Sequence, residues 1–236
     1  MIVSIRPAPH SKRCALDGRS SCNLYQNHQE KCAMHCKEDM CCEMKHCWAV
    51  GRALETELTR RGHSVFMADP AFRKRWPESA AAQATREAMA ALNAHNPHVH
   101  LAIHTNANGN ENVRGIQAMY PPSRYGERAQ KSRALSACLA SALQGIYDGK
   151  VSTREYSALE INTCPGAGCY LELGYGNTNR ADAQFVHEHP REIACALADG
   201  LENYARQQNL TMPAAPEKSL EERVAALEAW RESLQP

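Results

Sequence analysis

Apolar positions recur with two different periods along the chain, and their alternation predicts strands and helices in turn. Short apolar or alternating runs predict strands at residues 2–5, 63–67, 99–104, 115–120 and 169–173. Apolar residues at every third or fourth position predict helices at 43–61 and 79–94, one with an apolar face over 135–146, and one that begins at Pro190. Because strands and helices alternate, we expect an α/β fold. It would be a single three-layer domain over residues 1–207, with a twisted, mixed or mostly parallel sheet flanked by helices.

Two segments fall outside this alternation. Residues 11–42 form an irregular, cysteine-rich insertion after the first strand. Residues 208–218 contain Pro213 and Pro216 and predict a linker, and residues 219–236 predict a short amphipathic C-terminal helix. A helix this short is marginal alone, so it is either a solvated tail or a segment that docks on the body or pairs copies into a homo-oligomer.

The charge balance limits the partners. The 236 residues include 27 basic and 26 acidic side chains, and a net charge of +1 gives no overall field that would attract nucleic acid or an anionic membrane. We therefore expect neither as a partner. No apolar stretch reaches the length of a membrane span, and the first residues lack the pattern of a signal peptide, so we expect synthesis in the cytoplasm.

The chain contains 11 cysteines, an odd number, and no Cys-x-x-Cys pair. We expect reduced thiols, because the chain is larger than the small secreted domains that depend on disulfides. Cys164 and Cys169, which flank a Pro-Gly turn, are the one pair that would form a bridge if any does. A structural zinc site in the 11–42 insertion, where histidines accompany six cysteines, is the alternative use of that segment.

Histidine and glutamate residues at strand ends are the candidates for chemistry, because a rigid α/β frame presents functional groups there. His104 ends a predicted strand, whereas His98 lies about 20 Å back along it, too far to share an ion with His104. Glu172 lies within an apolar strand, where burying a carboxylate is costly unless it is paired, but the alternation equally allows an outward-facing side chain. Glu43 opens a helix, where the helix dipole alone would favour it.

Four segments together form a pattern that resembles a known family. They are a first strand that leads to His10, a glutamate-initiated helix that ends in Arg60-Arg61-Gly62, the strand end Ile103-His104-Thr105-Asn106-Ala107, and Leu171-Glu172-Leu173-Gly174-Tyr175-Gly176-Asn177. In these segments the chain resembles the zinc-dependent N-acetylmuramoyl-L-alanine amidases of the amidase-3 type, which cleave bacterial cell wall. The resemblance covers nearly all of residues 1–207.

This resemblance implies a catalytic zinc ion held by His10, Glu43 and His104, with Glu172 as the catalytic glutamate. Two imidazoles and one carboxylate leave a zinc ion open positions for water and a substrate oxygen. Zinc lowers the pKa of water and polarises the amide carbonyl, and Glu172 would move the proton from the water to the leaving nitrogen. The implied reaction is cleavage of the amide bond between N-acetylmuramic acid and L-alanine in peptidoglycan.

The segment around His10 departs from the family pattern. The family usually has Asp-Pro-Gly-His-Gly-Gly, where this chain has Arg6-Pro7-Ala8-Pro9-His10-Ser11. His28 is therefore an alternative first ligand. Glu160, the next carboxylate upstream of Glu172, is the alternative general base.

The linker and C-terminal helix, together with the missing signal-peptide pattern, resemble phage endolysins, which accumulate in the cytoplasm and reach the cell wall at lysis. Bacteriolysis is then the expected outcome. Two other functions stay open: a zinc amidohydrolase that acts on a small N-acyl amino acid, and a non-catalytic wall-binding or scaffold protein of the same fold.

Overall fold

The computed structural model describes residues 1–9, 43–68 and 78–211. Its strands are β1 Ile2–Pro7, β2 Ser64–Met67, β3 Val99–His104, β4 Ile116–Tyr120, β5 Val151–Glu155 and β6 Ala167–Glu172. They form one sheet in the order β2-β1-β3-β6-β4-β5, in which only the β4–β6 pair is antiparallel. The predicted α/β fold with a mixed, mostly parallel sheet is therefore confirmed.

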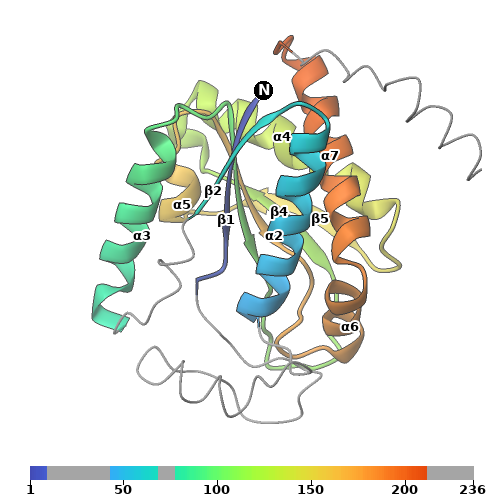
Figure 1. Cartoon of the computed structure of the whole chain (residues 1–236). Coiled ribbons are helices and arrows are strands. Elements are labelled where there is room, and N and C mark those ends of the chain that lie inside the picture. The colour runs from blue at the N-terminus through green and yellow to red at the C-terminus, as the bar shows by residue number, and fades with distance from the viewer. Residues whose placement is uncertain (10–42, 69–77, 212–236) are drawn as a thin grey trace, which may run out of the picture.

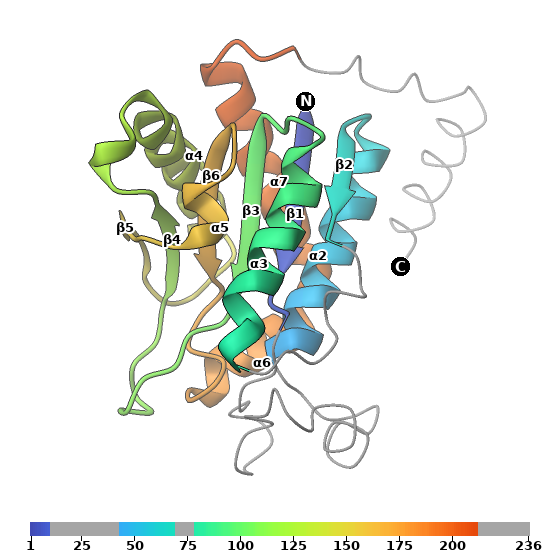
Figure 2. The same cartoon turned by 90° about the vertical axis from the view of Figure 1, so that its left-hand side faces the viewer.

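Helices cover both faces of the sheet. They are α2 Glu43–Arg60, α3 Glu78–Asn93, α4 Glu127–Gln144, α5 Leu159–Asn162, α6 Arg180–Glu188 and α7 Pro190–Gln207, with a 3-10 turn, η2, at Ser123–Tyr125. On one face α7 packs against both α2 and α4, and on the other α3 packs against α5 (Figures 1 and 2). None of the described helices is long and apolar enough to cross a membrane.

The two faces of the sheet differ in chemistry. Odd-numbered positions of β1 and β3 belong to one large apolar core beneath α2, α4 and α7: Val3, Ile5, Leu101 and Ile103. Even-numbered positions of the same strands lie on the face of α3 and α5, and most are polar although they are buried: Ser4, Arg6, His100 and His104. Buried polar groups require internal partners. The partners on this face define the candidate site.

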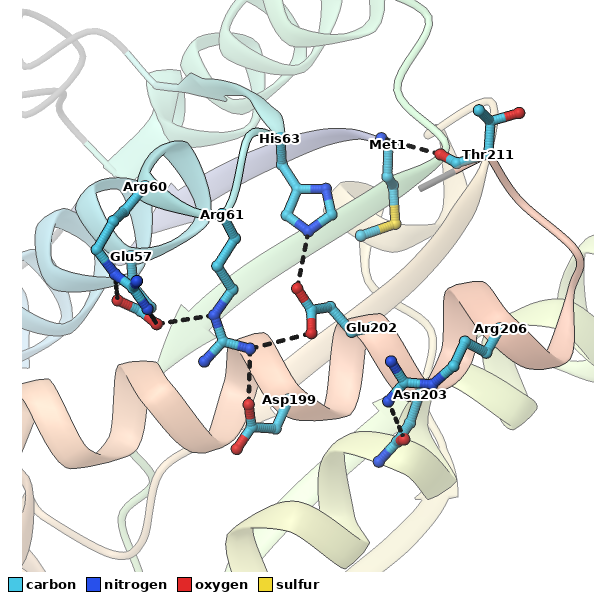
Figure 3. Close-up of polar contacts among 10 residues, drawn as sticks. All are labelled: Met1, Glu57, Arg60, Arg61, His63, Asp199, Glu202, Asn203, Arg206 and Thr211. Atoms are coloured by element: carbon cyan, nitrogen blue, oxygen red, sulfur yellow. Dashed lines mark hydrogen bonds and ion pairs between the residues drawn. The ribbon is translucent and has the colours of Figure 1, made fainter. Parts of the chain in front are cut away.

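Arg61 fastens the end of α2 to α7. Its guanidinium donates hydrogen bonds to Glu57 at 2.7 Å, to Asp199 at 2.6 Å and to Glu202 at 3.2 Å (Figure 3). Glu202 also lies 3.3 Å from the Nε2 atom of the buried His63, just beyond α2. Of the two arginines at the end of this helix, Arg61 therefore links α2 to α7, whereas Arg60 hydrogen-bonds Glu57 within the helix.

Within the described residues, all of the predicted strands and helices are present, with small shifts at their ends, and Gly62 follows α2 with a φ of 82°. The sequence did not predict β5, α5 or α6. β5 is an edge strand whose last residues are exposed and polar, and α5 is a single turn, so neither has a clear apolar period. The last strand begins at Ala167 instead of Cys169, because Gly168 joins the ladder opposite His100.

Among the described cysteines, Cys138, Cys164, Cys169 and Cys195 are free thiols. The sulfurs of the candidate pair have separate partners: Cys164 lies 3.2 Å from the carbonyl oxygen of Gly166, and Cys169 accepts a hydrogen bond from Ser136 at 3.2 Å. The cysteine-rich insertion, the linker beyond Thr211 and the predicted helix at 219–236 lie outside the described residues.

Candidate active site

Two of the predicted site residues meet at the carboxyl ends of parallel strands. His104 is the last residue of β3, Glu172 is the last residue of β6, and the two are paired in the β3–β6 ladder. Paired residues of adjacent strands point to the same face, here the face of α3 and α5. In open α/β sheets, ligands bind at this edge.

The His104 imidazole is 3% exposed and is held on three sides. Its Nδ1 atom lies 3.1 Å from Oε1 of Glu43, and its Nε2 atom lies 3.2 Å from Oε1 of Glu160. The ring stacks on Tyr170, with 4.4 Å between the ring centroids. Burial alone would lower the pKa of His104, but the carboxylates of Glu160 and Glu43 outweigh it and raise the pKa to about 9.

Glu43 reaches the site from the opposite layer of helices. It is the first residue of α2, is 1% exposed, and accepts a second hydrogen bond on Oε1 from the backbone N–H of Thr105 at 3.3 Å. A helix-opening carboxylate that only complements the helix dipole would lie in solvent. Its burial against His104 instead favours the predicted role as a ligand.

Glu160 and Arg6 form a buried ion pair next to His104. Arg6 comes from β1 and donates to Oε1 of Glu160 and, at 3.2 Å, to the hydroxyl of Thr85 on α3. Burial raises the pKa of Glu160, but the charges of Arg6 and His104 oppose this and lower the pKa to about 2, so Glu160 is a carboxylate. The sequence named Glu160 only as an alternative base and gave Arg6 no role. The signal available in the sequence was that Arg6 and Glu160 are charged residues next to apolar ones.

Glu172 shares the His104 face, and one of its carboxylate oxygens is buried, so the outward-facing alternative is wrong. Tyr170, two residues earlier on β6, lies between the rings of His104 and Tyr156. Burial raises the pKa of Tyr170 well above its usual value, and the carboxylates of Glu160 and Glu172 raise it further. A neutral phenol therefore forms one wall of the acidic site.

Three hydrogen bonds fix the loops that follow His104 and Glu172. Asn177 donates to the carbonyl oxygen of Thr105 at 3.0 Å and accepts from its hydroxyl at 3.3 Å. Asp182, fully buried on α6, accepts the backbone N–H of Tyr175 at 2.8 Å. Asp182 could not be identified from the sequence, because nothing in a short polar segment distinguishes it from a solvated aspartate.

Residues 28–203 match the family model of N-acetylmuramoyl-L-alanine amidases of the amidase-3 type. The chain belongs to this amidase family. No curated protein shows a sequence match to it.

Solved structures of amidases share the fold. The catalytic domain of CwlV, an N-acetylmuramoyl-L-alanine amidase from Bacillus (Paenibacillus) polymyxa var. colistinus, superposes with a TM-score of 0.61 at 15% identity, covering 89% of this chain and 99% of that one. Ami1 from Mycobacterium smegmatis gives 0.61 at 20% identity, covering 88% and 98%. The catalytic domain of the CD27L endolysin, which targets Clostridia difficile, gives 0.58 at 14% identity, covering 86% and 97%.

The described residues of this amidase supply part of a metal-binding site. Nδ1 of His104 and Oε1 of Glu43 converge, and nitrogen and carboxylate donors suit zinc. Among the described residues, Glu43, Glu160 and Glu172 bring three carboxylates to the site, and Arg6 brings one guanidinium; with His104 as a neutral ligand, a divalent cation balances the remaining negative charge. Within residues 1–9, 43–68 and 78–211, no group of three metal-ligating side chains occurs.

The remaining predicted ligands, His10 and His28, lie outside the described residues. Two other histidines, His98 just before β3 and His100 within it, have partners elsewhere. Nδ1 of His98 accepts the backbone N–H of Ile2 at 2.9 Å, at the opposite end of the strand, and the buried His100 contacts the hydroxyl of Ser4 at 2.9 Å. The structure thus places His104 close to Glu43 and pairs it with Glu172 in the sheet, and it brings Glu160 to the same site.

Proposed function

We propose that this amidase hydrolyses the bond between N-acetylmuramic acid and L-alanine in peptidoglycan, with a zinc ion held by Glu43, His104 and His10. One observation carries the proposal. The imidazole of His104 faces Glu43 at 3.1 Å at the sheet edge where Glu172 is its ladder partner. The family supports the peptidoglycan substrate.

In this proposal, bound zinc supplies a Lewis acid and lowers the pKa of water. Glu172 acts as the general base: its carboxylate takes a proton from the attacking water and gives it to the leaving L-alanine nitrogen. Its place at a strand end beside His104 suits this role, because the side chain is held by the sheet yet remains partly accessible. Tyr170 excludes water from one side of the imidazole.

Replacing Glu172 with glutamine tests the assignment. The amide keeps the shape of the side chain but cannot accept a proton, so turnover of purified cell wall should fall by about 100-fold or more. Zinc content, measured by elemental analysis, should stay the same. Glu155→Gln, at the exposed end of β5, is the matched control and should keep full activity.

A zinc-loaded Glu172→Gln enzyme that releases L-alanine amino termini at the wild-type rate would remove Glu172 from the mechanism. In that case Glu160 would be the next carboxylate to test. Absence of any wall cleavage by the zinc-loaded wild-type protein would instead favour a non-catalytic wall-binding role.

We further propose that the enzyme acts as an endolysin, made in the cytoplasm and released to the wall at lysis. The likeness to the CD27L endolysin domain supports this narrower role. Cells that express the chain should stay intact until their membrane is permeabilised and should then lose turbidity, whereas cells that express His104→Ala should not. Equal turbidity loss in both cultures would contradict the proposal.

A further inference from the structure

The site contains a carboxylate that the proposed reaction does not use. Glu160 is 7% exposed, and its Oε1 atom faces the Nε2 atom of His104. An imidazole has two ring nitrogens, and the other one, Nδ1, faces Glu43. A metal-bound imidazole is neutral and carries one N–H, so if Nε2–H donates to Glu160, the lone pair of Nδ1 is directed to the side where Glu43 lies.

The position of Glu160 is fixed by its surroundings. It lies on α5, whose Ile161 is fully buried in an apolar cluster with Ala102 of β3 and Tyr170 of β6. Arg128 closes the end of this turn by donating to the carbonyl oxygen of Asn162 at 2.7 Å. The carboxylate therefore approaches His104 from a rigid support.

Arg6 compensates the charge that this arrangement buries. Its guanidinium, 4% exposed, donates to the same Oε1 atom that faces His104 and is itself steadied by Thr85 at 3.2 Å. A buried carboxylate without a partner would be costly. With Arg6 in place, Glu160 stays an acceptor and leaves the second nitrogen of His104 to the zinc.

We propose that Glu160 is the positioning residue of the zinc site: it accepts the Nε2–H of His104 and directs Nδ1 toward Glu43, and Arg6 holds Glu160 in this role. The inference rests on the proposed function only in taking Glu43 and His104 as zinc ligands. Metal-ligating histidines commonly donate their other N–H to such a group, and losing it typically weakens metal binding 10- to 100-fold. The alternative is a purely structural Arg6–Glu160 ion pair that zinc binding does not sense.

Zinc affinity, measured by competition with a chromogenic chelator, separates these two roles without any need for catalysis. Glu160→Ala should weaken zinc binding by about 10- to 100-fold. Glu160→Gln should recover most of the affinity, because its amide oxygen can still accept the Nε2–H. Glu155→Ala, which removes an exposed glutamate, should bind zinc as the wild type does.

Because Glu160→Ala leaves the charge of Arg6 buried, the double variant Arg6→Met, Glu160→Met provides a second test in which both charges are gone. It should show the same loss of zinc affinity while it remains folded by circular dichroism. The ¹⁵N spectrum of His104 in the zinc-loaded wild type should show zinc on Nδ1 and hydrogen on Nε2.

Two results would overturn the inference: folded Glu160 variants that bind zinc as tightly as the wild type, or a His104 that carries zinc on Nε2. If His104→Ala also left zinc affinity unchanged, the zinc assignment in the proposed function would fail as well. A loss in His104→Ala without a loss in the Glu160 variants would contradict the positioning role alone.

Discussion

Asp182 supports the turn that follows Glu172, and replacing it with asparagine should destabilise the protein measurably. Oδ1 of Asp182 accepts from Tyr147 at 2.6 Å and from Nε of Arg114 at 3.0 Å, and Oδ2 accepts from the backbone N–H groups of Gly115 at 3.1 Å and Tyr175 at 2.8 Å. An asparagine presents one oxygen and one NH2 group to these four donors. In either orientation of the amide, two of the four donors therefore face its NH2 group, which cannot accept a hydrogen bond from them.

The magnitude follows from the less costly orientation of the new amide. If its oxygen stays with the two backbone N–H groups, the Tyr147 hydroxyl can rotate to accept from the NH2 group. Arg114 keeps its bond to Asp148 at 2.7 Å but loses the one to residue 182. Losing a hydrogen bond to a charged group costs about 1.5–3 kcal/mol, so we expect the free energy of unfolding to fall by about 2–3 kcal/mol.

Equilibrium urea unfolding followed by circular dichroism measures this change. Asp148→Asn is the control, because it makes the same change in the other carboxylate that binds Arg114, on a side chain that is 75% exposed, and it should cost less than about 1 kcal/mol. Asp182→Asn should also slow wall hydrolysis without loss of zinc, since Tyr175 lies three residues after Glu172. An unfolding free energy within about 0.5 kcal/mol of the wild type would refute the reasoning, because such a loss is smaller than that of one buried hydrogen bond.

Further predictions concern the metal, the acid stability and the tail. His104→Ala should lose most bound zinc and remain folded, as elemental analysis and circular dichroism would show; full zinc content would contradict the ligand assignment. Arg60 and Arg61 hydrogen-bond Glu57 and lower its pKa to about 2, so the stability it contributes is present above its ordinary pKa of 4.5 and is lost as the pH falls through 2. Glu57→Gln should therefore be less stable than the wild type at pH 7, by less than about 1 kcal/mol, and the difference should vanish as the pH falls below about 2. Deleting residues 219–236 should leave activity on soluble muropeptides nearly intact, and lost activity would place the tail on the catalytic body.

Most strands and helices of the fold could be predicted because the spacing of their apolar residues is regular. Apolar residues recur at alternate positions of β1 and β3 and fill most of β6, and α2 and α7 carry regular apolar faces, as strands and amphipathic helices do. β5 and α5 escaped prediction because an edge strand and a single turn leave too few buried positions to define a period. Periodicity also placed Tyr170 and Glu172 on one face but could not show that α3 and α5 cover that face.

The site could be predicted only where a residue lies in a recognisable segment. His104 and Glu172 lie at strand ends within family-like motifs, and Glu43 opens a helix of the expected length. Arg6 and Glu160 could not be paired, because they are 154 positions apart and come from segments without a common pattern. Arg6 also stands where the family pattern has aspartate, and the structure gives this departure a partner in Glu160.

Mass spectrometry of purified peptidoglycan after digestion tests the central claim most directly. Zinc-loaded wild-type protein should release peptides with new L-alanine amino termini and leave muramic acid with free lactyl carboxyl groups. A chelator should abolish this release, and Glu172→Gln should reduce it by about 100-fold. Intact amide bonds in wall that has been cleaved within its glycan strands or within its peptides would contradict the account.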